Sequence, residues 1–119
     1  MKARIDFEPI VQQIAQVVII VDHDLRIVWA NAQAVEVAGG DPVGRHCYAV
    51  YQGRQTPCEG CHTLQTFETG QSVPNTSTVT DEYGQSRFFD GFTTVVSWNE
   101  QDRPALVAEV AGEVGGTVQ

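Results

Sequence analysis

The stretch "VVIIVDHDLRIVWAN", Val17 to Asn31, decides the fold. Two β-rich apolar runs flank the polar "DHD", and this pattern predicts a β-hairpin. The first run does not alternate between apolar and polar residues, so we expect both of its faces to be covered. Asn31 can cap a short helix, "AQAVEVA", which stops at Gly39. The hairpin therefore leads directly into a helical segment.

A helix is predicted before the hairpin, in "DFEPIVQQIAQVV". Asp6 can cap it, and Pro9 falls in the first turn, where proline is tolerated. Four of its apolar residues follow helical spacing and form one stripe: Phe7, Ile10, Val11 and Ile14. An apolar stripe outside the main sheet needs a surface to cover it, so we predict that these residues form a homodimer interface.

Downstream of the hairpin, "TPCEGCHTLQTFETG" predicts a helix that ends at Gly70. Thr56 and Glu59 have the spacing of a capping box, with Pro57 at the first helical position. Three strands follow, joined by the turn signals "DEYG" and "NEQDR": "SVPNTSTVT", "SRFFDGFTTVVSW" and "RPALVAEVAGEV". This order predicts an α+β domain in which short helices cover one face of a single antiparallel sheet.

The composition of the 119 residues is that of one acidic globular domain. Acidic residues outnumber Lys and Arg by 15 to 7, which gives a formal net charge of −8. Because a nucleic-acid or anionic membrane surface selects a basic patch, we expect neither as a partner. The start "MKARIDFEP" lacks the apolar core of a signal peptide, and no apolar run is long enough to span a membrane, so we expect a cytoplasmic protein.

The order of elements and several phrases resemble a PAS domain, a bacterial sensory module. These phrases are "IIVDHDLRIVWAN", "GDPVGRHCYAVY" and "FETGQSV", followed by the three-strand ending. More narrowly, the chain resembles a subset with Gly-x-x-Cys-Tyr and Pro-Cys-x-x-Cys-Pro, matched here by Gly44, Cys47, Tyr48, Pro57, Cys58 and Cys61. His62 stands where this subset usually has proline, and Leu25 where the hairpin often has glycine. The last strand lacks the Asp-Ile/Val-Thr motif with which PAS domains usually lead into an effector domain.

The resemblance implies a non-catalytic input domain of a larger signalling protein, such as a histidine kinase, another two-component sensor or a cyclase. Such domains often dimerise and hold a small ligand between the sheet and the helices. We therefore predict an N-terminal helix in residues 1–16, a sensor domain in residues 17–114 and a tail in residues 115–119. The signal would be a small ligand, or a redox or metal event.

All three cysteines fall in "CYAVYQGRQTPCEGCH", residues 47–62. Four interpretations remain open. Cys47, Cys58 and Cys61 could bind a metal or an iron–sulfur cluster with His62 or His46; Cys58 and Cys61 could form a redox-switchable disulfide; "CEGCH" could attach haem covalently; or the cysteines could simply pack in the core. A stand-alone metal- or haem-binding redox protein is thus the alternative function, and the cofactor is left unassigned.

We also predict that the three cysteines lie close together and that Cys58 is the most reactive. Cys58 is two residues past the predicted cap, Thr56. There, unpaired amide groups and the helix dipole would favour a thiolate.

Overall fold

The computed structural model describes residues 3–81 and 83–114, so the predicted tail, residues 115–119, lies outside the described residues. The helices are α1 (Glu8–Gln13), α2 (Ala32–Ala38), α3 (Cys47–Gln52) and α4 (His62–Thr69). The strands are β1 (Val17–Val21), β2 (Ile27–Ala30), β3 (Val73–Thr80), β4 (Ser86–Trp98) and β5 (Pro104–Glu113). In the described part of the chain, no helix has the length and apolar character needed to cross a membrane.

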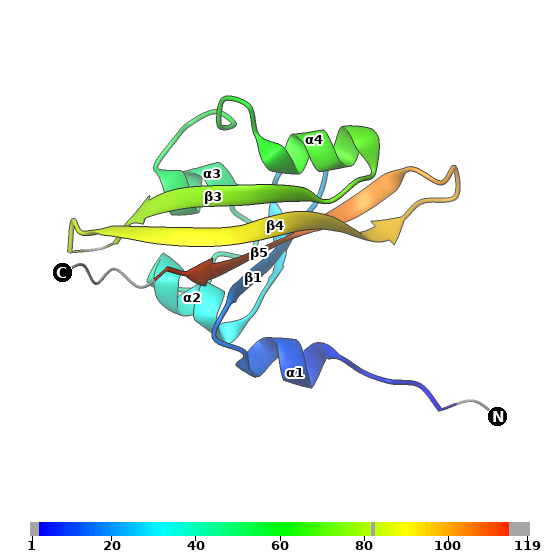
Figure 1. Ribbon diagram of the computed structural model, residues 1–119, viewed down its shortest axis with the longest axis horizontal. Helices are drawn as coiled ribbons and strands as arrows, with labels where there is room; N and C mark the ends of the chain where they lie inside the picture. Colours follow the sequence, from blue (N-terminus) through cyan, green and yellow to red (C-terminus); the bar gives the residue numbers. More distant parts are fainter. Residues whose placement is uncertain (1–2, 82, 115–119) are drawn as a thin grey trace.

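The five strands form one sheet in the order β2-β1-β5-β4-β3 (Figure 1), which confirms the predicted fold class. Every neighbouring pair is antiparallel. The first and last strands of the domain meet at the centre of the sheet, where Ile19 pairs with Glu109. The other edge of β1 pairs with β2. Four of its five residues are buried, so both faces of the strand are covered, as its continuous apolar sequence predicts.

The core lies on one face of the sheet. Alternate residues of β1, Val17, Ile19 and Val21, point into it together with residues of β4 and β5. Helices α2, α3 and α4 cover this face with Ala34, Val37, Cys47 and Phe67. On the opposite face, Phe88 and Phe92 of β4 are exposed.

The turn of the β1–β2 hairpin is held by Asp22, whose Oδ1 accepts hydrogen bonds from the backbone N–H groups of Asp24 and Arg26. Leu25 has a positive φ of 63°, a conformation that glycine adopts without a steric cost. It is nevertheless only 2% exposed and belongs to the core. The leucine therefore fills the core at a position where the resemblance implies glycine.

Helix α1 is shorter than predicted. It ends at Gln13, and Ile14 is already extended. The β-branched run starting at Val17 pairs with β5 instead of continuing the helix. Phe7 and Ile10 remain 61% and 60% exposed. α1 lies at the N-terminal end of the molecule, away from α3 and α4 (Figure 1).

The helix predicted from Pro57 begins only at His62, with Cys61 as its N-cap residue. Gly60 has a φ of 64°, a left-handed conformation that interrupts any helix running through it. The guanidinium of Arg54 donates hydrogen bonds to the carbonyls of Thr56 and Pro57, which fixes a loop in place of the predicted first turn. The capping-box prediction is therefore wrong, although the helix ends at Gly70 as predicted.

Candidate functional site

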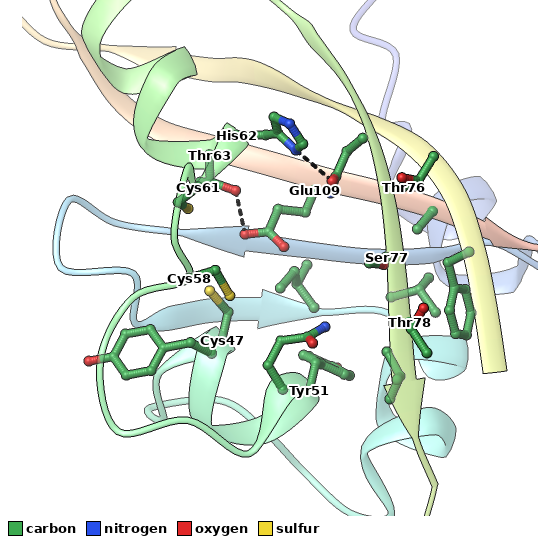
Figure 2. A pocket seen from close by; sticks show the side chains of 18 of the residues that line it. Cys47, Tyr51, Cys58, Cys61, His62, Thr63, Thr76, Ser77, Thr78 and Glu109 are labelled. Carbon is green, nitrogen blue, oxygen red and sulfur yellow. Dashed lines mark hydrogen bonds between the residues drawn. The ribbon is translucent and has the colours of Figure 1, made fainter. Parts of the chain in front are cut away.

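A cavity of about 360 Å³ lies between the sheet and the helical segment. Its walls come from β1, β3, β4 and β5 on one side, and from α2, α3, the loop before α4 and the start of α4 on the other. All four predicted site residues line it: Cys47, Cys58, Cys61 and His62 (Figure 2). The alternative ligand His46 is not among the lining residues, and its ring stacks on that of Tyr48 with a centroid distance of 4.8 Å.

The residue that organises the cavity is Glu109, on the central strand β5. Thr63 Oγ1 donates a hydrogen bond to Glu109 Oε2 over 2.7 Å, and the Cys47 thiol is a neighbour of the same carboxylate, whose charge acts on it. Figure 2 shows the carboxylate between Thr63 and the sulfur atoms of Cys47 and Cys58. A helix, a loop and a strand therefore meet around one acidic group.

Burial sets the ionisation of this cluster. It raises the pKa of the Glu109 carboxyl, while the hydrogen bond from Thr63 lowers it less. Burial also raises the pKa of the Cys47 thiol, and the negative charge of Glu109 raises it further. The pKa of the Tyr51 phenol rises for the same two reasons. At neutral pH, Cys47 is therefore a protonated thiol beside Glu109.

Cys58 does not have the environment predicted for it. It lies in the loop before α4, outside the helix. Burial and the neighbouring Cys61 raise the pKa of its thiol, while Arg54 lowers it less. The helix-terminus argument for a reactive Cys58 is therefore wrong, because the turn that should stabilise a thiolate is not helical.

The three cysteines are free thiols. Across residues 3–81 and 83–114, no group of three or more His, Cys, Asp or Glu side chains is arranged to hold a metal ion. The metal, iron–sulfur, haem and disulfide interpretations stay predictions.

The rest of the cavity combines polar and apolar walls. His62 Nδ1 lies 2.7 Å from Asn75 Oδ1, which joins the start of α4 to β3. Val17, Ile19 and Phe89 supply apolar surface. A pocket with apolar walls and a few fixed polar groups is typical of a small-molecule binding site. Glu109 was not predicted from the sequence; the available signal was an acidic residue inside the otherwise apolar "ALVAEVAG".

Comparison with protein families identifies the family of this domain. A family model described as a PAS fold matches residues 11–116. The chain belongs to the PAS fold family. This confirms the resemblance seen in the sequence. A comparison with curated proteins gives no significant match.

Solved structures of PAS-fold proteins are similar over most of the chain. VqmA of Vibrio cholerae, in a complex with a ligand and DNA, has a TM-score of 0.71 and 18% identity, and the match covers 98% of this chain and 54% of VqmA. The PAS domain of nitrogen regulation protein NR(II) from Vibrio parahaemolyticus has a TM-score of 0.68 and 17% identity, over 89% and 95% of the two chains. A Rhodobacter sphaeroides LOV protein has a TM-score of 0.70 and 14% identity, over 95% and 67%.

The prediction that nucleic acid is excluded as a partner is wrong. VqmA, in which this fold occurs, has been solved with DNA, and this PAS domain spans only about half of that chain. The physical reason is that a net charge of −8 describes the surface of this domain alone. It does not constrain what other parts of a longer chain bind.

We expect Glu109→Gln to make the ligand-free protein more stable at pH 8. The pKa of Glu109 is higher in the folded state than in the unfolded state. Below the unfolded-state pKa, the side chain is neutral in both states and its full contribution to stability is present. As the pH rises through the folded-state pKa, the side chain ionises inside the protein and this contribution is lost. Gln has the same shape without the buried charge, and a gain of about 1 kcal/mol would increase Tm by about 4 °C. Thermal unfolding from pH 4 to pH 8 measures this difference, which should disappear at pH 4.

Glu59→Gln is the matched control, because it removes the same charge from an exposed residue at the cavity. Its Tm should stay within about 2 °C of the original at both pH values. A Glu109→Gln protein that is less stable at pH 8 would contradict the prediction, since the ionised carboxylate would then contribute net stability.

Proposed function

We propose that this PAS domain is the sensory input domain of a larger cytoplasmic signalling protein, and that it detects a small molecule in the cavity around Glu109. The observation that carries the proposal is the cavity itself: about 360 Å³, with the half-buried carboxylate of Glu109 on one wall. Its size falls within the range of ligand pockets in proteins. In this proposal the domain is a sensor and has no catalytic role.

The comparisons support a small-molecule signal. VqmA, which has this fold, has been solved bound to DPO, and the match covers 56% of its chain. By analogy, the effector that reads the signal is a separate part of the parent protein. That this effector is a histidine kinase stays a prediction.

Native mass spectrometry of protein purified from cells tests whether the domain carries a bound small molecule. We expect a mass excess that disappears on denaturation. Ser77→Phe, which adds a ring to a residue lining the cavity, should abolish it. Thr80→Phe is the control, because Thr80 is exposed and is not among the lining residues. A protein that carries no small molecule and shows no stabilisation by any fraction of a cell extract would refute the proposed function.

The proposal includes pairing of two chains through α1, with Phe7, Ile10, Val11 and Ile14 at the interface. Phe7 and Ile10 are 61% and 60% exposed in the single chain, so pairing would bury apolar surface. We expect Ile10→Glu to convert the dimer into a folded monomer, measured by light scattering and circular dichroism. Gln13→Glu is the control, because it adds a charge at an exposed α1 position outside the stripe. A dimeric Ile10→Glu protein would contradict this interface.

A further inference from the structure

We propose that the ligand is a small organic cation with N–H donors, and that Glu109 is the residue that binds its charged group. This inference rests on the proposed function, because it names the chemical class of molecule that the same cavity takes. Three observations carry it: the hydrogen-bond capacity of the carboxylate, the charges around the cavity and the apolar walls beyond them.

The Glu109 carboxylate has hydrogen-bond capacity to spare. An ionised carboxylate offers about four lone-pair positions on its two oxygens. Among the described side chains, the hydroxyl of Thr63 donates a hydrogen bond to it, and the protonated thiol of Cys47 is a close neighbour. Both groups are neutral, so they surround the carboxylate without cancelling its charge. An N–H cation would complete its hydrogen bonding and neutralise it.

The charges around the cavity select the same class of ligand. Among the described residues that line it, two are carboxylates, Glu109 and Glu59, and none is Lys or Arg. The guanidinium of Arg54 acts on nearby Cys58, but its hydrogen bonds go to the loop carbonyls of Thr56 and Pro57. A carboxylate or phosphate ligand would therefore place its charge beside that of Glu109 with no lining Lys or Arg to balance it.

The walls beyond Glu109 limit the rest of the ligand. Val17 and Ile19 lie on β1, Phe89 lies on β4, and all three are buried core residues that also line the cavity. A ligand that reaches Glu109 therefore places its remaining atoms against apolar side chains. This favours a cation attached to a ring or a short hydrocarbon over a fully polar one, because apolar contact adds to the affinity.

The surroundings of Glu109 oppose its negative charge. Burial raises the pKa of the carboxyl, so keeping it ionised costs free energy. Ionisable groups with perturbed pKa values that face a cavity are common in functional sites. Binding of a cation would recover the cost, because the charge of Glu109 would then be paired.

Three isosteric probes test the proposal: benzamidine as a cation, benzamide as its neutral analogue and benzoate as an anion. Dissociation constants are measured at pH 8 by two-dimensional NMR titration, following the backbone amides of Thr63 and Glu109. We expect benzamidine to bind at least tenfold more tightly than benzamide or benzoate. Glu109→Gln should remove this preference and leave benzamide binding within twofold. Glu68→Gln, which removes an exposed carboxylate of α4 outside the cavity lining, should change each constant by less than twofold.

Three results would overturn the proposal. Binding of benzoate or benzamide as tight as that of benzamidine would refute the cation assignment while leaving a ligand-binding domain intact. Unchanged benzamidine affinity in Glu109→Gln would refute the role of this carboxylate. If none of the three probes shifts the Thr63 and Glu109 amides, the cavity does not take this class of molecule, and only a ligand found by mass spectrometry would preserve the proposed function.

Discussion

Gly91→Ala should strongly destabilise the domain, because the new methyl group would collide with the neighbouring strand. A Cβ atom at Gly91 would lie 1.7 Å from the carbonyl oxygen of Val110 and 2.7 Å from the Cα of Ala111, both of them backbone atoms. Neither can rotate away. The strands β4 and β5 would have to separate at the point where Gly91 pairs with Ala111. We expect a loss of about 3 kcal/mol or more in unfolding free energy, measured by urea denaturation.

Gly112→Ala is the matched control for this prediction. Gly112 lies on the adjacent strand and pairs with Asp90, the neighbour of Gly91. The nearest atoms to a Cβ there belong to the flexible side chain of Gln16, at 3.4 Å. We expect a change below about 1 kcal/mol. Equal destabilisation by both substitutions would mean that β propensity, rather than the close approach of the two backbones, determines the effect of Gly91.

The sheet could be predicted because each strand is recognisable from a short, continuous stretch of sequence. Each strand is an apolar or alternating run bounded by turn residues, and the Asn31 cap and the Gly39 and Gly70 ends are readable one element at a time. The first turn of α4 was not predictable, because Thr56 and Glu59 fit a capping box as well as a loop. Only the left-handed conformation of Gly60 and the hydrogen bonds of Arg54 show that this segment is a loop and not the first turn of a helix.

The candidate site could be predicted only in part, because one part of it is local in sequence and the other is not. The cysteines are close in sequence, and their spacing drew attention to residues 47–62, a segment that contributes to the cavity wall. Glu109 is far away along the chain and reaches Thr63 across 46 residues. Its role depends on strand order, because β5 lies at the centre of the sheet, against β1. A single acidic residue in an apolar strand carries no information about which helix faces it.

Asn31→Ala is the second substitution for which we expect a large effect. Asn31 is fully buried, and its side chain makes four hydrogen bonds to the backbone. Oδ1 accepts from the amides of Val18 and Ala34, and Nδ2 donates to the carbonyls of Val11 and Gln16. One side chain therefore joins α1, the segment after it, β1 and the start of α2.

Alanine at position 31 would leave all four backbone groups without this partner. Each hydrogen bond contributes about 1 kcal/mol net, and a buried group left unpaired costs more, so we expect a loss of about 3–5 kcal/mol in unfolding free energy. Gln33→Ala is the control on the same helix, because the side-chain amide of Gln33 donates only to exposed Glu36. Its effect should stay below about 0.5 kcal/mol.

Asn31→Asp separates the two halves of this network. The carboxylate keeps the acceptors for Val18 and Ala34 but loses the donors to Val11 and Gln16, and it introduces a buried negative charge. Burial and two carbonyl neighbours favour the protonated acid, whose stabilising contribution is lost as the pH rises through its raised pKa. Asn31→Asp should therefore be closer to the original stability at pH 4 than at pH 8, whereas the loss in Asn31→Ala should be independent of pH. A pH-independent Asn31→Asp protein would mean that the donors of Asn31 contribute little, and that its importance lies in capping α2 and holding β1.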